Sequence, residues 1–285
     1  MEISVVMSVY NERPEQVQQA ISSILRQTYL PTEFIIVLDD PNQSDLKALL
    51  QDYDHQTDII KLVLNRENIG LAASLNKAIE LASNELIARM DADDISEPRR
   101  LELELDELKR RHLDLVSGNI AYMDENGIVT GGKSIIPEDE RLIAKLLPYG
   151  STIIHPTVLM RKSAIEQVGG YRLLPTAEDY DLWLRMLASG LKIGSINAQR
   201  KRIGHDTFKS DDYDLFAKIN DEPMRQKFNR GQYHFELAMY ALRNKKIAHA
   251  CYRIIKAMFT TKNNFQFVIN YLSFRVIWFA SERVR

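Results

Sequence analysis

The sequence is short of several features that would narrow its class. It has one cysteine, Cys251, in 285 residues, which excludes an internal disulfide and suits a reducing compartment. The opening stretch MEISVVMSVY lacks the basic region and cleavage site of a secretory signal. No Gly-x-Gly-x-x-Gly follows the first predicted strand, which disfavours a dinucleotide-binding dehydrogenase. We therefore expect a cytoplasmic, globular protein.

Charge is distributed unevenly along the chain. Residues 225–285 carry 12 Lys and Arg against 2 Asp and Glu, whereas residues 1–224 carry 25 against 37. A basic end on an acidic body indicates an anionic partner. The ordered aromatic and glycine motifs of single-strand binders are absent, so we expect no nucleic acid.

The last segment, Phe265–Arg285, combines an apolar helical face with flanking arginines. Gln266, Asn270 and Arg275 interrupt it, so it is not expected to span a bilayer, which takes about 20 mostly apolar residues. The pattern is typical of a helix that lies on an anionic membrane surface. Packing on the rest of the chain, or in a homodimer, explains the same face nearly as well.

Strands and helices alternate in the first 110 residues. Buried strands are predicted at Ile3–Val9, 34–40, 59–65 and 85–91, with helices after Pro14, at Asp45–Leu50, after Gly70 and from Ser96 and Pro98 onward. This alternation predicts an α/β fold with a doubly wound parallel sheet. After Leu113 the pattern weakens to a hairpin at 120–129, a strand-like stretch at 153–160 and helices at Leu142–Leu147 and Glu178–Ser189.

Acidic residues follow three of the predicted strands. They are Glu12, Asp39, Asp40, Asp91 and Asp93. Because the carboxyl ends of parallel strands meet at one edge of a sheet, we expect these side chains to converge. Clustered carboxylates need a cation, and Mg²⁺ or Mn²⁺ would bind them together with a diphosphate. The alternative is turn chemistry, with Asp94 or Ser96 capping the next helix.

A second acidic pair, Glu178 and Asp179, lies in the first turn of a predicted helix within PTAEDYDLWLRML. Carboxylates at that position favour the helix dipole, and the spacing alone supports this structural role over a general base. Trp183 on the same helix is expected in the core.

Six segments, taken in order, resemble a known enzyme family. SVVMSVYNE, FIIVLDD, NIGLAASLNKAI, MDADD, GGYR and AEDYDLWLRM are similar to family-2 glycosyltransferases of the GT-A fold, over about Ile3–His205. The likeness is greatest to bacterial members that build capsule, lipopolysaccharide or exopolysaccharide. It implies a GT-A (Rossmann-like), mostly parallel sheet flanked by helices, with a C-terminal helical appendage. The glycosyltransferase domain would span 1–222, with 1–95 binding nucleotide and 96–222 binding acceptor, and a basic helical region would span 223–285.

The resemblance also implies roles for individual residues. The nucleotide-sugar pocket would include Val9, Tyr10, Glu12, Asn68, Gly70, Asn76, Asp91 and Arg202, with Asp39 or Asp40 on the base. Pro41 and Asn42 depart from the family pattern after these aspartates, so that choice stays open. Asp93 would be the ligand of Mn²⁺ or Mg²⁺, with Asp91 and His205 as further candidates. His205 is equally well explained as an ordinary loop residue.

The implied reaction is a single inverting displacement in which Asp179, beside Glu178, is the base. The donor would be a nucleotide-sugar, expected to be a UDP-sugar. The acceptor would be a growing glycan, linked to a polyprenyl diphosphate, at the inner face of the cell membrane. The chain lacks the Gln-x-x-Arg-Trp motif of processive members, which indicates one sugar per encounter.

Two other functions share part of this pattern. A sugar-nucleotide nucleotidyltransferase would need the sheet and the metal carboxylates but not the Glu178–Asp179 helix. A non-catalytic nucleotide-sugar-binding subunit would bind a nucleoside diphosphate without turnover, and the intact acidic pair argues against it.

Overall fold

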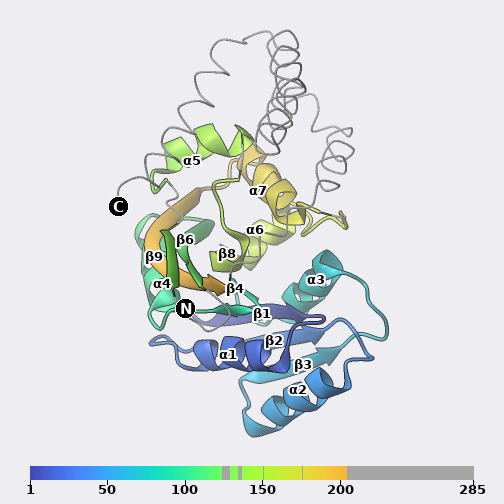
Figure 1. Ribbon diagram of the computed structural model, residues 1–285. Helices are drawn as coiled ribbons and strands as arrows, with labels where there is room; N and C mark the ends of the chain where they lie inside the picture. The colour runs from blue at the N-terminus through green and yellow to red at the C-terminus, as the bar shows by residue number, and fades with distance from the viewer. Residues whose placement is uncertain (124–128, 134–136, 150, 175, 204–285) are drawn as a thin grey trace, which may run out of the picture. The chain divides into compact units, whose positions relative to one another are not determined.

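Four parallel strands form the first half of the sheet. They are β1 (Ile3–Val9), β2 (Glu33–Leu38), β3 (Ile60–Leu64) and β4 (Leu86–Asp91), in spatial order β3-β2-β1-β4. The computed structural model describes residues 1–123, 129–133, 137–149, 151–174 and 176–203 (Figure 1). Apolar runs build β1, β2 and β4 because both faces of these strands are covered. The register places Val6 opposite Ile35 on β2 and opposite Arg89 on β4.

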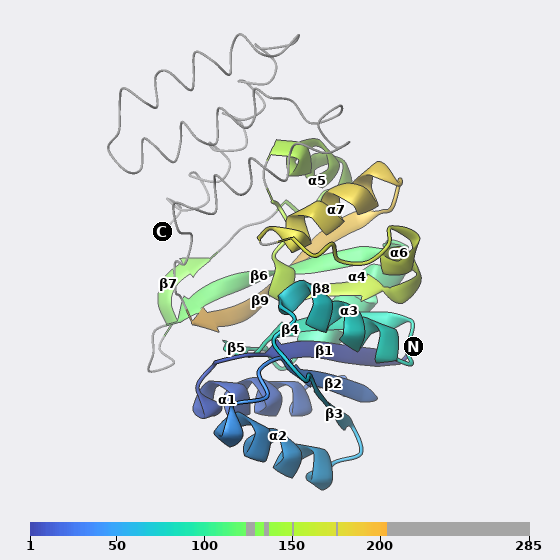
Figure 2. The ribbon, with the colours of Figure 1, turned by 90° about the vertical axis from the view of Figure 1, so that its right-hand side faces the viewer.

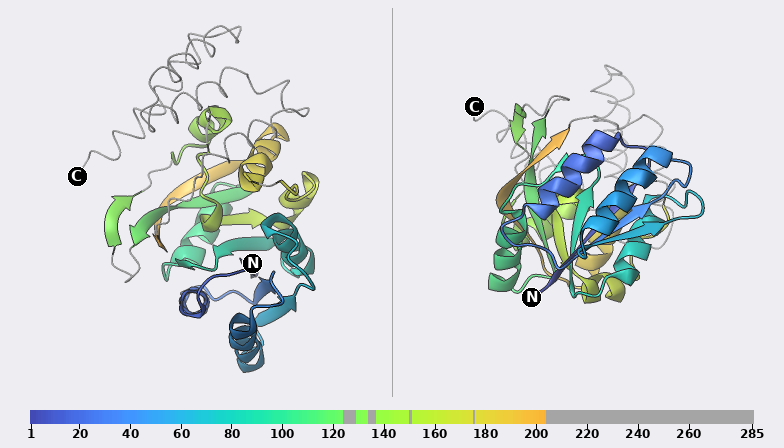
Figure 3. Two further views of the ribbon diagram at one scale, coloured as in Figure 1. Left: turned by 45° about the vertical axis from the view of Figure 1, so that its right-hand side comes forward. Right: turned by 90° about the horizontal axis from the view of Figure 1, so that it is seen from below.

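Helices cover both faces of these strands. α1 (Pro14–Leu25), α2 (Ser44–Gln56) and α4 (Arg100–Arg110) contribute to one hydrophobic cluster, and α3 (Leu71–Leu81) lies on the opposite face (Figures 1 and 2). α1 and α2 lie side by side under the strands (Figure 3). Pro14 suits the first position of α1, since its φ angle is preset and its missing N–H would have no partner there.

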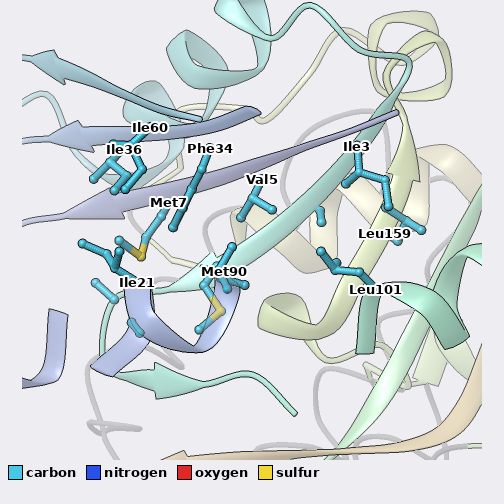
Figure 4. Packing of buried hydrophobic residues seen from close by; sticks show 14 of the residues in the cluster. Ile3, Val5, Met7, Ile21, Phe34, Ile36, Ile60, Met90, Leu101 and Leu159 are labelled. Carbon is cyan, nitrogen blue, oxygen red and sulfur yellow. The ribbon is translucent and has the colours of Figure 1, made fainter. Parts of the chain in front are cut away.

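Alternate side chains of the strands build the main core. Its labelled members in Figure 4 are Ile3, Val5, Met7, Ile21, Phe34, Ile36, Ile60, Met90, Leu101 and Leu159, all at most 5% exposed. Fully burying one such side chain stabilises the fold by about 1.5–3 kcal/mol relative to leaving it exposed. The carboxyl ends of the strands are therefore anchored in a packed core, which holds the acidic residues that follow them in place.

The second half of the sheet is mixed. Its strands are β5 (Asp94–Ile95), β6 (Leu115–Met123), β7 (Val129–Lys133), β8 (Val158–Arg161) and β9 (Ile193–Ile203). β8 runs antiparallel between β4 and β6, β9 runs parallel to β6, and β5 and β7 pair antiparallel with β9 and β6. The remaining elements are α5 (Glu140–Leu146), η1 (Leu147–Tyr149), η2 (His155–Thr157), α6 (Lys162–Gln167) and α7 (Glu178–Ala188).

The structure confirms the α/β class, adds one strand and corrects one local expectation. β9 was not predicted. The helix expected from Ser96 and Pro98 begins instead at Arg100. Ser96 bonds back toward α1: its N–H donates to Ser23 Oγ at 2.9 Å, and its hydroxyl accepts from Gln27 Nε2 at 3.1 Å. Ser96 therefore stabilises the loop before α4 and caps no helix.

The buried Arg100 side chain of α4 joins the two halves of the sheet. Arg100 Nε donates to Glu104 Oε1 at 2.8 Å, and both side chains are at most 2% exposed. The Arg100 guanidinium also donates to the carbonyl oxygens of Arg89 on β4 at 2.9 Å and of Val158 on β8 at 3.3 Å. These bonds satisfy a buried charge that would otherwise be costly, and they fix α4 across the β4–β8 boundary.

The chain divides into two units. The first consists of Met1–Leu147, Ser151–Leu173 and Glu178–His205 and holds every described strand, whereas the second contains Asp206–Arg285. The expected domain boundary at 222/223 and the basic C-terminal helices lie outside the described residues. Among the helices that are described, none is long and apolar enough to cross a membrane.

Candidate active site

The loop between β4 and β5 gathers three aspartates. One carboxylate oxygen from each of Asp91, Asp93 and Asp94 lies within 4.8 Å of the others. Asp94 is fully buried, and the other two are partly buried. The loop is held at its far end because β5 pairs with β9, with Asp94 opposite Arg202. Carboxylate oxygens this close suit a hard divalent cation such as Mg²⁺ or Mn²⁺.

A buried cation, Arg89, adjoins this cluster. Arg89 and Asp91 are two positions apart on β4, so their side chains emerge on the same face and form an ion pair. Arg89 is 3% exposed. Burial alone would lower the pKa of its guanidinium, but the charges of Asp91 and Asp94 outweigh burial and raise it. Arg89 therefore stays charged and offsets part of the negative charge of the loop.

Glu12 joins the aspartate loop from the end of β1. Its Oε2 accepts a hydrogen bond from Tyr10 N at 2.8 Å. Burial raises the pKa of the Glu12 carboxyl, and the charges of Asp93 and Asp91 raise it further, although the bond from Tyr10 opposes the shift. The carboxylates after β1 and β4 thus act on one another, as expected.

The Asp39 carboxylate bonds to the loop between β3 and α3. It accepts from Asn65 Nδ2 at 2.7 Å, from Ile69 N at 3.0 Å and from Gly70 N at 2.9 Å, and the residue is 2% exposed. Gly70 has φ +86°, a conformation that favours glycine. Asp39 therefore organises the loop between β3 and α3 rather than extending the aspartate cluster.

Asp40 and Asn68 also form local bonds. The Asp40 carboxylate accepts from Asn42 N at 2.9 Å, from Asn42 Nδ2 at 3.0 Å and from Gln43 Nε2 at 3.3 Å. Asn68 Oδ1 accepts from Gly70 N at 3.0 Å. Asp40 is partly exposed and Asn68 is exposed, so both can still meet a ligand.

The pocket residues expected at β1 divide between surface and core. Tyr10 is 43% exposed and can contact a ligand. The Val9 side chain is fully buried in the core, which leaves a ligand no access to it. Asn76 lies on α3, where its amide bonds the backbone of Tyr171. For Arg202 the structure describes only the backbone, which lies opposite Asp94. His205 lies outside the described residues.

The acidic pair begins α7, as predicted. Burial raises the pKa of Asp179 to about 6, and the Glu178 charge adds to the rise, whereas the N–H of Tyr180, at 2.7 Å, and the Arg89 charge lower it. Burial also raises the pKa of Glu178, with Arg89 lowering it and Asp91 raising it. Because Arg89 and Asp91 act on this pair, the start of α7 and the aspartate loop share one electrostatic site.

A buried hydrogen-bonded pair, Tyr171 and His155, adjoins the site. The Tyr171 hydroxyl lies 2.8 Å from His155 Nε2, and both residues are buried. Burial raises the pKa of the Tyr171 phenol, so this group stays protonated. The His155 ring also meets Trp183 edge-on, with centroids 5.9 Å apart. Trp183 is fully buried, which confirms its expected place in the core.

Known proteins resemble this chain in sequence. The family profile described as Glycosyl transferase family 2 matches residues 4–169, more than half of the chain. The chain belongs to glycosyl transferase family 2. It is 34% identical, over 65% of its length and 71% of the other's, to the O-antigen biosynthesis glycosyltransferase WbnJ of Escherichia coli. It is 32% identical, over 66% and 68%, to the UDP-Gal:alpha-D-GlcNAc-diphosphoundecaprenol beta-1,3-galactosyltransferase of the same species.

A solved structure supports the fold of this family 2 chain. Residues 1–349 of TarS from S. aureus, crystallised in complex with UDP-GlcNAc, superpose with a TM-score of 0.64 at 17% identity. The superposition covers 90% of this chain and 80% of the other. The GT-A architecture expected from the resemblance is thereby confirmed for the described residues.

Four residues of this family 2 site were missed in the sequence. Arg89 lies in an otherwise apolar strand. Its spacing of two residues from Asp91, which places both side chains on one face, was the sequence feature that could have revealed it. Asp94 has a place in the sequence pattern only as an alternative cap of the next helix, but α4 begins six residues later, at Arg100. Tyr171 lies in the quoted GGYR without an assigned role. His155 carried no signal, since its partner Tyr171 is 16 positions away.

Proposed function

We propose that this family 2 chain transfers one sugar at a time, with inversion, from a nucleotide-sugar to a hydroxyl group of a growing cell-surface glycan. The observation that carries the proposal is the raised pKa of Asp179 at the start of α7. Its pKa of about 6 lets the carboxylate exist at neutral pH and still accept a proton readily. Asp179 lies in the first turn of α7. The charge of Arg89, the ion-pair partner of Asp91, lowers the pKa of Asp179.

Asp179 acts as the general base. The acceptor hydroxyl loses its proton to this carboxylate while its oxygen bonds to the anomeric carbon of the donor. The bond between that carbon and the diphosphate oxygen breaks in the same step, and the electron pair leaves with the nucleoside diphosphate. Glu178 supports the base, because its negative charge raises the pKa of Asp179.

The aspartate loop fits a divalent cation. Asp91, Asp93 and Asp94 would hold Mg²⁺ or Mn²⁺, since the three offer hard oxygen ligands within 4.8 Å of one another. When bound, the ion supplies positive charge that stabilises the departing diphosphate. Arg89 orients Asp91 through their ion pair. Arg202, whose backbone lies opposite Asp94, is proposed as a second cation near the diphosphate.

The donor is proposed to be a UDP-sugar that lies along the carboxyl ends of β1, β2 and β4. Tyr10, Glu12, Asn68 and Gly70 line this edge. Either Asp39 or Asp40 contacts the base. Asp40→Asn separates the two, because it leaves the bonds of Asp39 to the loop at Gly70 in place, so a loss of UDP affinity in this variant would assign the base contact to Asp40. Two similar proteins support UDP, since the name of the E. coli galactosyltransferase includes UDP-Gal and TarS was crystallised with UDP-GlcNAc.

The acceptor is proposed to be a glycan on a polyprenyl diphosphate at the cytoplasmic face of the membrane. The E. coli galactosyltransferase named above acts on such a diphosphoundecaprenol sugar. The excess of basic residues in 225–285 would hold the enzyme reversibly at an anionic surface, with each Lys or Arg worth about 1 kcal/mol. We expect sedimentation with anionic vesicles that weakens at high salt and is lost when Phe265–Arg285 is deleted. Binding that survives this deletion would leave the segment as a packing or dimer element.

A release assay tests the reaction. The purified chain is incubated with a panel of UDP-sugars and Mn²⁺, with and without a polyprenyl-diphosphate-linked sugar, and free UDP is measured. We expect acceptor-dependent release of UDP from one donor, and a product whose anomeric configuration by NMR is opposite to that of the donor. Release of pyrophosphate from a nucleoside triphosphate and a sugar phosphate would indicate a nucleotidyltransferase. Tight UDP binding without release from any donor would indicate a non-catalytic subunit.

A further inference from the structure

The backbone of Tyr171 is held by one side chain of α3. Asn76 Nδ2 donates to Tyr171 O at 2.7 Å, and Tyr171 N donates to Asn76 Oδ1 at 2.9 Å. The amide thus satisfies both backbone groups of a single residue, as a neighbouring strand would. Both polar atoms of Asn76 are engaged, although α3 belongs to the nucleotide-binding half and Tyr171 follows α6 in the acceptor half.

The same turn is held from its other side by α7. Arg185 donates to the carbonyl oxygens of Val168 and of Gly170, the latter at 2.7 Å. Its Nε donates to Asp181 Oδ2 at 2.8 Å, and both side chains are at most 9% exposed. A fully bonded, charge-assisted pair in a buried place fixes geometry well, because a guanidinium offers its donors in one plane.

Gly170 allows the turn to come this close to α3. Its φ is +69°, which side-chain-bearing residues rarely adopt. A Cβ atom at this position would lie 2.8 Å from Asn76 Oδ1, closer than packed atoms tolerate. The turn is therefore shaped around the Asn76 amide.

The Tyr171 side chain makes a second connection to α7. Its hydroxyl bonds His155 Nε2, and the His155 ring packs edge-on against Trp183 of α7. Tyr171 is consequently linked to α3 by its backbone and to α7 through His155.

We propose that the turn Val168–Tyr171 is a positioning strap that fixes α7, and with it the carboxylate of Asp179 in the first turn of that helix, relative to α3. Asn76 and Arg185 are the positioning residues at its two ends. The proposal rests on Asp179 being the base, as proposed above. It gives Asn76 a role different from the nucleotide contact that the family resemblance implies, since the strap occupies the Asn76 amide.

Two near-isosteric variants weaken the strap at opposite ends. Asn76→Asp keeps the size and the acceptor for Tyr171 N but places an oxygen against Tyr171 O. Arg185→Lys keeps the charge beside Asp181 but loses the planar fork over the two carbonyl groups. Each should lower kcat by about 10²-fold, since a misplacement of roughly 1 Å at the reacting groups has that effect. UDP affinity should not change, because the donor contacts are intact.

The double variant tests whether the two residues act through one strap. Once one end has failed, weakening the other should change little, so the combined loss in kcat should be close to the larger single loss. Fully multiplied losses would mean that Asn76 and Arg185 act separately, which contradicts the proposal.

Matched variants elsewhere control for general destabilisation. Asn84→Asp removes amide bonds to Ser4 Oγ at 3.0 Å and Thr32 Oγ1 at 2.9 Å. Arg161→Lys removes a bond from Nε to the carbonyl of Leu113 at 3.1 Å. Measured well below the unfolding temperature of every variant, these controls should keep wild-type kcat. Equal losses of kcat in controls and strap variants would overturn the proposal.

A signal that needs no turnover separates this proposal from the proposed function. The chain has two tryptophans, so a Trp278→Phe background leaves Trp183 as the only indole. Acrylamide should quench Trp183 more strongly in both strap variants than in either control. If the unmodified protein releases no UDP, the proposed function fails while quenching still tests the strap. Unchanged quenching and kcat in Asn76→Asp, together with lost UDP affinity, would make Asn76 a nucleotide ligand and end the proposal.

Discussion

The two halves of the sheet hold their functional carboxylates in different ways. In the parallel half, Glu12 and the aspartate loop directly follow β1 and β4, which pair with each other over six residues. In the mixed half, Asp179 follows no strand and lies in the first turn of α7, which side-chain bonds attach to its surroundings. The difference teaches that the proposed metal-binding loop is fixed by the sheet itself, whereas the proposed base is fixed by packing contacts that can be altered without unfolding the sheet.

The largest expected effect is on the parallel side. Asp93→Ala should abolish transfer and the part of UDP binding that depends on Mg²⁺ or Mn²⁺, since the loop would lose a proposed ligand while β4 and its core remain. Transfer rates and UDP titrations with and without the metal ion measure this. If transfer persists in excess chelator, with or without Asp93, the loop is not a metal site.

The matching change on the mixed side should leave the donor bound. Asp179→Asn keeps the shape of the side chain but removes the proton acceptor, so the rate should fall by about 10²–10⁴-fold. UDP affinity should stay near the wild-type value, in contrast to Asp93→Ala. Glu178→Gln is the control, and a larger loss there than in Asp179→Asn would move the base to Glu178.

The boundary between the halves can be tested through stability. Glu104→Gln leaves the buried Arg100 charge without its carboxylate partner, and breaking such a pair typically costs about 3–5 kcal/mol. Glu102→Gln on the same helix breaks an exposed pair with Arg99 and should leave the free energy of unfolding nearly unchanged. Urea unfolding of the two variants measures both. Equal free energies would show that the buried pair does not support the β4–β8 boundary.

The smallest expected effect concerns pH. Because Asp179 must be ionised to act, kcat should fall about tenfold per pH unit below about pH 6. The contribution of Asp179 to the free energy of unfolding should change in the opposite direction and increase as the pH falls. Since the folded pKa is raised above the unfolded value, this group contributes more stability as pH falls through 6. A pH–rate profile of wild type beside a stability profile of Asp179→Asn checks both signs, and an acid limb near pH 4 would contradict the raised pKa.

The parallel half could be predicted because its information is local. Ile3–Val9 is an uninterrupted apolar run, and Pro14 starts the following helix, so strand and helix follow from neighbouring residues. The strand-end aspartates could then be placed by topology alone. Asp39 is the instructive exception, because no strand rule shows that its carboxylate accepts from Asn65, Ile69 and Gly70.

The mixed half depends on partners that are distant in sequence. β9 contains Gln199 and the basic residues Arg200–Arg202, so it lacks an apolar pattern and forms by pairing with β6, which ends some 70 residues earlier. Arg89 can be buried in β4 because Asp91 and Asp94 supply compensating charge. Such arrangements have no local signature and require the folded chain.

The pairing of β5 with β9 has a mechanical consequence. β5 is two residues long and directly follows the aspartate loop, and its ladder partner β9 ends at Ile203. A pull on the backbone at Ile203 would be shared along the long β6–β9 ladder, but it would reach Asp94 through only two paired residues. The two-residue pairing of β5 with β9 would thus separate under tension before the longer ladders do, and the aspartate loop would lose its far support first.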